Sequence, residues 1–353
     1  MKWIDGKFLG IRGKAFPKAE NYRRLEENDL IIMDKVSPAY SDVRIKTGMA
    51  WLGTNSSGLH IDFKTDSKNI CFKWSVALNN VPVSMTLLTQ SGLDLYVKDG
   101  EWKYFSSAIP DYDGLIFDCN KKDFYCQCVF EHESKNFPDE FNEYSLNLCL
   151  YDEVTRLEVG IDDNAEIGGL DLYNGKPIVF YGSSLTQGCS ASRPGMAYTN
   201  ILRRKLNCEV CNLGFSGCGR LEHKMSEILS KSAPKLLIMD CVPNMAVHCG
   251  SEFCERFEYF YKTYRNKNKE IPILFMAFPV FTNTFGKMNI YLEYNEKLKF
   301  IFDRWAKEDK KIFWYEFPQS EFSLGEYSVD GIHGSDIGFE FIADNLYNQI
   351  KNI

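Results

Sequence analysis

The chain has 353 residues, of which 44% are hydrophobic and 25% are charged, and its formal net charge is −7. This length can bury a large core and allows two domains. The acidic balance argues against nucleic acid or an anionic membrane surface as partner. No apolar run approaches the ~20 residues that span a bilayer. The composition therefore predicts a globular protein with no nucleic-acid and no membrane partner.

Targeting and metal signals are weak. The sequence begins Met-Lys-Trp-Ile-Asp-Gly-Lys, which lacks the apolar core of a secretory signal. Among twelve scattered cysteines, Cys208 and Cys211 form the only close pair of metal type, and no second pair or nearby histidine completes a zinc set. We expect reduced, mostly buried thiols, no metal and a cytoplasmic location. A secreted protein that lacked its signal would give the same sequence, so the alternative stays open.

The first half of the chain, residues 1–174, is expected to be all β. Short runs rich in β-branched and aromatic residues are separated by Gly, Asp, Asn and Pro, and a Lys-Asp-Gly-Glu segment at 98–101 predicts a hairpin. The pattern predicts a β-sandwich or jelly roll. The expected strands are 59–63, 69–76, 93–98, 102–106, 115–118, 125–130, 144–150 and 155–159.

From residue 175 strand-length apolar runs alternate with helical stretches. This alternation predicts a parallel sheet with helices on both faces, a three-layer α/β/α domain. The Asn-Gly-Lys-Pro segment at 174–177 is a natural junction, so two domains are predicted, 1–174 and 175–353. The expected strands are 178–181, 209–213, 236–240, 271–278 and 311–315, and the expected helices lie near 195–206, 221–231, 251–267, 288–308 and 335–350.

A serine-rich turn follows the first strand of this second half. The apolar run that ends at Tyr181 breaks at Gly182 into two serines, and the turn closes at Gly188. Ligands of parallel sheets sit at such strand ends. The turn lacks the lysine of a P-loop, and Thr186 stands where a nucleophile elbow needs its second glycine. A helix-capping turn is the alternative interpretation.

The segment 182–188, Gly-Ser-Ser-Leu-Thr-Gln-Gly, resembles the first block of the SGNH (GDSL-like) hydrolases, whose domain is flavodoxin-like. The resemblance implies that Ser184 is the nucleophile. Ser183 stands where that superfamily usually has aspartate, and we expect it to orient the turn. Upstream, Gly-Leu-Asp-Leu-Tyr at 92–96 resembles the motif of the GxDLY domain, which precedes SGNH hydrolase domains.

A nucleophilic serine needs a base, and one of the five histidines has an acid at a useful spacing. Asp330 lies three residues before His333, close enough on a tight turn to reach the imidazole Nδ1–H and fix its tautomer. The Asp-x-x-His pair resembles the last SGNH block, although Gly334 stands where proline is common and was expected to loosen the loop. An Asx-type turn before a helix is the alternative.

Acyl transfer also needs N–H donors for the oxyanion. The segment 212–217 resembles the second SGNH block, so Gly217 would supply a backbone N–H, and a glycine is expected there because a side chain would obstruct the substrate. Asn244, in a segment that resembles the third block, would supply its amide, although Pro243 replaces the usual glycine. The Ser184 N–H would be a further donor. Ordinary turns are the alternatives.

These features predict a serine esterase that works through an acyl-enzyme and needs no metal or organic cofactor. Gly217 and Gly219 lack the third glycine of a dinucleotide fingerprint. No long apolar stretch adjoins the serine blocks to receive a fatty chain, so a short, acetyl ester is expected. Arg193 follows the serine turn and is either a substrate-binding residue at the mouth of the site or a solvated loop residue.

The expected partner is a small-molecule or saccharide ester, and a homo-oligomer is possible. A β-sandwich ahead of an SGNH domain resembles the arrangement in some carbohydrate esterases, which implies O-deacetylation of a sugar. A thioesterase or a lysophospholipase could use the same residues. A non-enzymatic glycan-binding protein with a degenerate site is the alternative that Ser183, Pro243 and Gly334 would favour.

Overall fold

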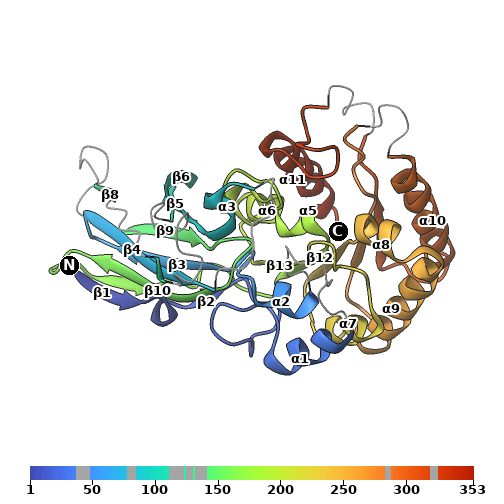
Figure 1. Ribbon diagram of the computed structural model, residues 1–353, viewed down its shortest axis with the longest axis horizontal. Helices are drawn as coiled ribbons and strands as arrows, with labels where there is room; N and C mark the ends of the chain where they lie inside the picture. The colour runs from blue at the N-terminus through green and yellow to red at the C-terminus, as the bar shows by residue number, and fades with distance from the viewer. Residues whose placement is uncertain are drawn as a thin grey trace.

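Figure 1 shows the computed structural model of the chain. It describes residues 1–36, 48–77, 85–110, 123–124, 130–131, 141–282, 288–318 and 325–353. Two β-sheets of the N-terminal half lie on the left of the view, and a sheet flanked by helices lies on the right (Figure 1). None of the helices in these ranges combines the length and apolarity that crossing a membrane requires.

The N-terminal half contains two antiparallel sheets. The first consists of β1 (Lys2–Asp5), β10 (Val154–Ile161), β4 (Asn69–Val76), β7 (Asp123–Phe124) and β8 (Phe130–Glu131). The second consists of β11 (Ile167–Gly169), β3 (His60–Thr65), β9 (Asn142–Asn147), β5 (Leu93–Asp99), β6 (Glu101–Ala108) and β2 (Ile11–Arg12), which pairs with β3.

The two antiparallel sheets share one apolar core. Phe72 and Leu157 of the first sheet belong to the same buried cluster as Phe63 and Leu146 of the second. The inner faces therefore pack on each other, as expected for a β-sandwich. The predicted hairpin is confirmed, because β5 and β6 pair on either side of Gly100, whose φ is +67°. The strand expected at 115–118, and all but the last residue of that expected at 125–130, lie outside the described residues.

The expectation that residues 1–174 are all β is wrong for three segments. The helices α1 (Glu27–Val36), α2 (Met49–Thr54) and α3 (Leu87–Ser91) interrupt the strands. Leu30 of α1 and Leu52 of α2 belong to the apolar cluster that contains the core of the C-terminal half. The four consecutive apolar residues that begin at Leu30 have no helical periodicity. Packing against the C-terminal half decides their conformation, which local pattern could not reveal.

The C-terminal half contains five parallel strands in the order β13-β12-β14-β15-β16, with β12 (Ile178–Gly182) second. This is the flavodoxin-like order, in which the chain changes direction beside its first strand. Every residue of β12, β13 and β14 is buried, which explains their largely apolar sequences. The other strands are β13 (Val210–Gly214), β14 (Leu236–Asp240), β15 (Ile273–Met276) and β16 (Ile312–Tyr315).

The helices of the C-terminal half form two groups. In one, α6 (Tyr198–Leu206) packs against α11 (Asp336–Ile350) (Figure 1). In the other, α9 contacts α7 and α10, and α10 contacts α8. The five predicted helices are confirmed, and the order of three layers stays a prediction. The second group comprises α7 (His223–Leu229), α8 (Val242–His248), α9 (Phe253–Lys267) and α10 (Asn289–Trp305).

Candidate active site

The site lies where β12, β13 and β14 end. In the parallel sheet Gly182 is in register with Gly214 on one side and with Asp240 on the other. The segments that follow these three strands therefore leave one edge of the sheet together, beside the position where strand order reverses. Ser184, Gly217 and Asn244 each lie in one of these segments, so the fold brings three predicted residues to the same edge.

The serine turn is a single helical turn, α5 (Ser184–Gln187), held at both ends. Ser183 is its N-cap and accepts a hydrogen bond from Leu185 N at 3.2 Å. Gly188 ends the turn with φ +99°. At Gly182 a side chain would overlap Thr186 Oγ1, so a glycine is required. Serine in the usual aspartate position thus still orients the turn, because its hydroxyl supplies the cap.

Three predicted residues form one hydrogen-bonded chain. Ser184 Oγ lies 2.8 Å from His333 Nε2, although the two residues are 149 positions apart. His333 Nδ1 lies 2.7 Å from Asp330 Oδ2. The other carboxylate oxygen of Asp330 accepts the backbone N–H of His333 at 2.8 Å and that of Ile332 at 2.9 Å. The carboxylate is therefore fixed, and it fixes the imidazole with Nε2 directed at the serine.

The negative charge of Asp330 and the positive charge of protonated His333 stabilise each other. Burial works against a charged Asp330, but the hydrogen bonds from His333 and Ile332 outweigh it and lower the pKa of the carboxyl to about 2. Burial likewise works to lower the pKa of His333, but the bond to Asp330 and the interaction with the Cys189 thiol raise the pKa to about 10. The arrangement therefore stabilises the imidazolium that forms once His333 has taken a proton from the serine.

The loop that carries His333 is held by backbone bonds. The His333 carbonyl accepts Val329 N at 3.0 Å and Ser328 Oγ at 2.7 Å. Two residues on, Ser335 is the N-cap of α11, and its own N–H donates to the Tyr327 carbonyl at 2.9 Å. These bonds hold the chain on both sides of position 334, and the expectation that glycine there loosens the loop stays a prediction.

The segments with the predicted oxyanion donors meet beside the serine turn. A side chain at Gly219 would overlap the Gly182 carbonyl and place its Cβ 3.3 Å from Asn244 Nδ2. Asn244 Nδ2 donates one hydrogen to the Phe215 carbonyl at 3.0 Å, and an amide has a second to offer. Pro243 occupies the first turn of α8, where its missing N–H costs nothing. The donor roles themselves stay predictions.

The expectation that a side chain at 217 would obstruct the substrate stays a prediction. Within the described part of the chain, a Cβ at Gly217 would meet no atom within 4 Å, so crowding by the protein itself does not exclude a side chain. The φ of this residue is +68°, a left-handed conformation that glycine adopts without strain. The backbone conformation therefore requires the glycine.

Comparison with known proteins agrees with this geometry. A family model described as the GDSL-like lipase/acylhydrolase family matches residues 175–351, and one described as the N-terminus of esterases of SGNH-hydrolase type matches residues 1–167. The chain belongs to the GDSL-like lipase/acylhydrolase family. It is thus an SGNH hydrolase, an enzyme, and the non-enzymatic alternative is not supported. Comparison with curated protein sequences finds no match.

Solved structures extend the similarity to both halves. A crystal structure assigned to a GDSL-like lipase from Bacteroides ovatus is 30% identical, with a TM-score of 0.84, and the match covers 99% of this chain and 97% of that one. A salicylyl-acyltransferase from a tetracycline biosynthetic pathway is 15% identical, with a TM-score of 0.74 and the same coverage. An acetyl xylan esterase from Butyrivibrio proteoclasticus is 11% identical, with a TM-score of 0.54 over 84% and 90% of the two chains.

Sequence reasoning missed a buried arginine behind the site of this GDSL-like hydrolase. The Arg24 guanidinium donates to the carbonyls of Gly214 at 2.6 Å and Asn212 at 3.2 Å, and it also donates to the carbonyls of Asn55 and Leu52. Its charge lies 4.7 Å from the centre of the Phe215 ring. Arg24 therefore ties the N-terminal half to the strand end that leads to Gly217. No local motif marks it, because its partners are backbone atoms 28 to 190 positions away.

A second missed residue, Gln187, lies within the serine turn and is fully buried. Its Nε2 donates to Asn55 Oδ1 and to the Leu150 carbonyl, both at 3.1 Å. Its Oε1 accepts the N–H of Ser216 at 2.9 Å, one residue before Gly217. One side chain thus connects the serine turn, the N-terminal half and the turn with the predicted oxyanion glycine. It occupies the variable position of the family block, which is why the motif gave no signal.

A third missed group lies directly beneath the serine turn. Asp240 Oδ2 accepts the hydroxyl of Thr186 at 2.6 Å and that of Tyr198 at 3.0 Å. Burial raises the pKa of Asp240 to about 7. Thr186, which stands where another hydrolase family has glycine, therefore has its own role as an anchor of the turn to β14.

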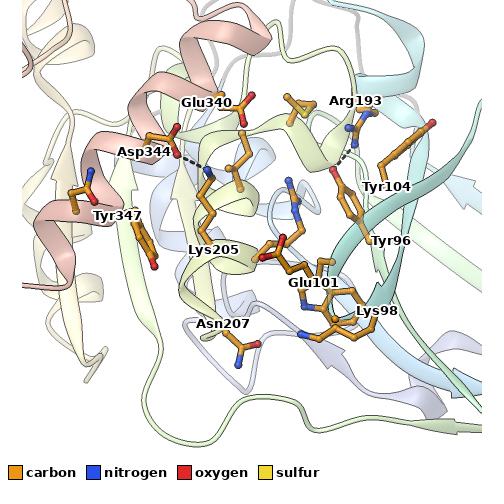
Figure 2. A pocket seen from close by; sticks show the side chains of 16 residues that line it. Tyr96, Lys98, Glu101, Tyr104, Arg193, Lys205, Asn207, Glu340, Asp344 and Tyr347 are labelled. Atoms are coloured by element: carbon orange, nitrogen blue, oxygen red, sulfur yellow. Dashed lines mark hydrogen bonds and ion pairs between the residues drawn. The ribbon is translucent and has the colours of Figure 1, made fainter.

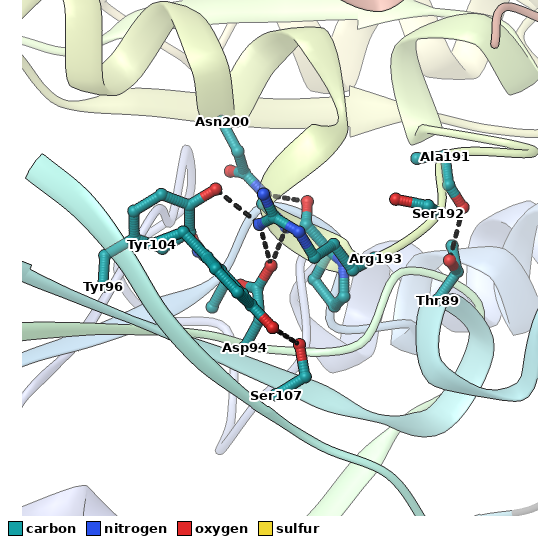
Figure 3. A network of polar contacts seen from close by, with 12 residues as sticks. Thr89, Asp94, Tyr96, Tyr104, Ser107, Ala191, Ser192, Arg193 and Asn200 are labelled. Carbon is teal, nitrogen blue, oxygen red and sulfur yellow. Dashed lines mark hydrogen bonds and ion pairs between the residues drawn. The ribbon is translucent and has the colours of Figure 1, made fainter. Parts of the chain in front are cut away.

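Arg193 lies against the sandwich. Its Nη1 donates to Asp94 Oδ2 at 2.9 Å and to the Tyr96 hydroxyl at 2.6 Å (Figure 3). Asp94 also accepts Gly195 N at 2.8 Å and Asn147 Nδ2 at 2.7 Å. The aspartate and tyrosine of the Gly-Leu-Asp-Leu-Tyr segment thus hold the loop that follows the serine turn. The predicted contact between Arg193 and substrate stays a prediction.

No cluster of three or more His, Cys, Asp or Glu side chains suited to a metal ion occurs in the described ranges. The predicted absence of a metal and of an organic cofactor stays a prediction.

Proposed function

We propose that the protein is a serine esterase that removes short acyl groups, acetyl above all, from carbohydrate esters through an acyl-enzyme. The hydrogen-bonded chain from Ser184 Oγ through His333 to Asp330 carries this proposal. A serine hydroxyl is a poor nucleophile at neutral pH, and an imidazole at 2.8 Å is placed to take its proton.

The first half of the reaction forms the acyl-enzyme. Ser184 Oγ attacks the ester carbonyl carbon while His333 Nε2 takes the hydroxyl proton, and Asp330 stabilises the imidazolium. The tetrahedral intermediate collapses when the C–O bond to the alcohol breaks and His333 gives its proton to the leaving oxygen. Water then attacks the acyl-enzyme by the same route, which releases the acid and restores the serine.

The negative oxygen of the tetrahedral intermediate needs donors. We assign this task to the backbone N–H groups of Ser184 and Gly217 and to the Asn244 amide, which lie in the segments after three neighbouring strands. Donors fixed by the backbone need no reorganisation during the reaction, and losing one typically costs about 10²–10³ in rate.

The carbohydrate substrate is supported by likeness of fold. Carbohydrate esterases of family two are among the similar solved structures, and one, from Clostridium thermocellum, is in complex with cellohexaose. That protein is 16% identical over 84% of this chain, with a TM-score of 0.55. An ester of a sugar hydroxyl fits a nucleophile whose histidine must protonate a leaving alcohol. A thioesterase or lysophospholipase would use the same chemistry on another leaving group.

The experiment compares the natural protein with a Ser184→Ala variant. We expect hydrolysis of p-nitrophenyl acetate and release of acetate from acetylated xylo-oligosaccharides, and both should fall at least 10³-fold in the variant. The unfolding temperature is the control for folding. Full activity in the variant would refute the assignment. Faster turnover of acyl-thioesters or long-chain esters than of acetylated sugars would instead favour a rival substrate.

The same assay across pH tests His333. The imidazole must be neutral to accept a proton, and its pKa is raised above the ordinary 6.5. Hence kcat/KM should rise with pH along a limb whose midpoint lies above pH 6.5. In Asp330→Asn the charge that raises the pKa of His333 is lost, so the midpoint should move to lower pH and the plateau should fall. An unchanged profile in that variant would contradict the role of Asp330.

A further inference from the structure

A cleft of about 870 Å³ separates the β5–β6 hairpin from helices α6 and α11 (Figure 2). Tyr96 and Tyr104 stand on the hairpin side, and Lys205 and Asp344 stand on the helix side. None of the described residues that line it belongs to the Ser184–His333–Asp330 group. The function proposed above therefore leaves this cleft unexplained.

One wall of the cleft is aromatic. Tyr104 is 48% exposed although it is a large ring, and the guanidinium of Arg193 lies 4.1 Å from its centre. Tyr96 is covered in the same way by Arg204, also at 4.1 Å. The rings are thus fixed in orientation by cations, and Tyr104 keeps an exposed surface. A fixed aromatic surface suits a ligand with apolar C–H faces.

The acids of the cleft have unused hydrogen-bonding capacity. Two exposed acids, Glu101 and Glu340, make no ion pair with any described residue. A ligand hydroxyl group can donate a hydrogen bond to such a carboxylate.

The charges of the cleft disfavour a strongly charged ligand. Four cations and three acids line it, and Lys205 is already paired with Asp344. An anion would approach Glu101 and Glu340, and a cation would approach Arg204. A neutral molecule could pack apolar C–H faces on the aromatic wall and donate hydrogen bonds from its hydroxyl groups to the acids. A neutral oligosaccharide has both properties.

The cleft also adjoins the loops of the candidate active site in the chain. Ser192 N donates to Asp336 Oδ1 at 2.9 Å, which joins the loop after the serine turn to the start of α11, three residues after His333. Two residues that line the cleft lie next along the chain: Arg193 follows Ser192, and Glu340 lies four residues after Asp336 in α11. A chain of several sugar units could therefore extend from the site into the cleft.

We propose that this cleft binds units of a neutral oligosaccharide remote from the reacting ester, which gives the carbohydrate substrate class of the proposed function its recognition site. The cleft would thus supply affinity for the chain, while the Ser184 group supplies the chemistry. This division predicts that losses in the cleft affect only substrates long enough to reach it.

Binding is tested first without catalysis. Unacetylated cellohexaose and xylohexaose are titrated into the Ser184→Ala protein by calorimetry. Tyr104→Ala, added to that protein, removes an exposed ring and should weaken binding at least tenfold. Phe300→Ala, which removes a 73% exposed ring on α10, is the matched control and should change nothing.

Kinetics then locate the effect. In the otherwise natural enzyme, Tyr104→Ala should raise KM for an acetylated hexasaccharide at least fivefold while leaving KM and kcat for p-nitrophenyl acetate unchanged. The inference is overturned if neither hexasaccharide binds at millimolar concentration, if Tyr104→Ala leaves binding or that KM unchanged, or if an oligogalacturonate binds more tightly. Failure of p-nitrophenyl acetate hydrolysis in the natural enzyme would overturn the proposed function instead, so the two failures are distinguishable.

Discussion

The N-terminal half meets the C-terminal half in two contrasting ways. Behind the serine turn the contact is closed. We call it the seam, made of Arg24, Asn55, Leu150 and Gln187, all of them buried. Along the β5–β6 hairpin the contact is open and leaves the cleft. In the seam Arg24 and Gln187 form hydrogen bonds mainly with backbone atoms, whereas in the cleft the exposed acids Glu101 and Glu340 make no ion pair with any described residue.

The contrast distinguishes the part of the interface that holds catalytic groups in position from the part that can bind a ligand. A buried, fully paired polar group holds its partners in one arrangement, because any other leaves it unsatisfied. In the seam, Arg24 donates to the Gly214 carbonyl at the strand end, and Gln187 accepts the N–H of Ser216 in the turn before Gly217. An open wall with unused acceptors can instead exchange water for ligand. The sandwich is thus expected to serve both the geometry of the reaction and the recognition of its substrate.

The largest effect should follow from removing the seam arginine. Arg24→Met deletes donors to four carbonyls, of which that of Leu52 still accepts Asn55 N. Leaving a buried acceptor without a donor typically costs about 1–3 kcal/mol, so we expect a loss of a few kcal/mol in the free energy of unfolding. Urea unfolding followed by circular dichroism measures it.

Arg24→Lys is the matched variant, since it keeps the charge but cannot reproduce the planar fork of donors. It should recover only part of the lost stability. If Arg24→Met unfolds at the same urea concentration as the natural protein, the seam does not hold the two halves together, and the contrast with the cleft disappears.

The second effect concerns rate. Gln187→Met removes the acceptor of Ser216 N and both donor bonds to the N-terminal half. The turn that carries Gly217 should shift, and small displacements of catalytic donors can cost about 10²-fold in rate. We expect kcat for p-nitrophenyl acetate to fall about 10- to 100-fold, with KM within about threefold, because the ground state makes little use of an oxyanion donor.

Thr86→Val is the control for this rate effect. Thr86 Oγ1 also donates across the two halves, to the Ser192 carbonyl at 3.0 Å, but it does not touch the turn with Gly217. Its loss, including that of a helix cap, should cost about 1 kcal/mol of stability while kcat stays unchanged. Equal effects of the two variants on kcat would mean that Gln187 acts only through stability.

The strands of the parallel sheet and the members of the hydrogen-bonded group were predictable from sequence, whereas β1, β2 and β11 of the N-terminal half were not expected. Buried strands of a parallel sheet are continuous apolar runs, so β12 and β14 were recognisable without any partner. Ser184 and His333 stand in family motifs, and parallel strands deliver such motifs to one edge. In these cases the physical cause is local, because the residue and its neighbours in sequence decide the outcome.

The seam was not predictable, because its cause is tertiary. Arg24 has no motif around it, and its partners near Gly214 lie about 190 positions further on. The helices α1 and α2 form where the chain packs on the C-terminal core, and their sequences carry no clear helical period. The positive φ of Gly217 was not predictable either, because a glycine required by its backbone conformation looks the same in sequence as one that leaves room for a substrate.

The smallest effect should come from the wall of the cleft. Lys205 and Asp344 form an ion pair between α6 and α11, and their side chains are 35% and 52% exposed. Exposed pairs gain little against water and are worth about 0–1 kcal/mol, so Lys205→Met should change the free energy of unfolding by no more than that. The small loss should shrink further in 0.5 M salt, because salt screens exposed charges. A loss above about 2 kcal/mol, or one insensitive to salt, would contradict this comparison. It would show that the wall of the cleft contributes to the free energy of unfolding as much as the buried seam does, since buried networks are costly to break and little screened by salt.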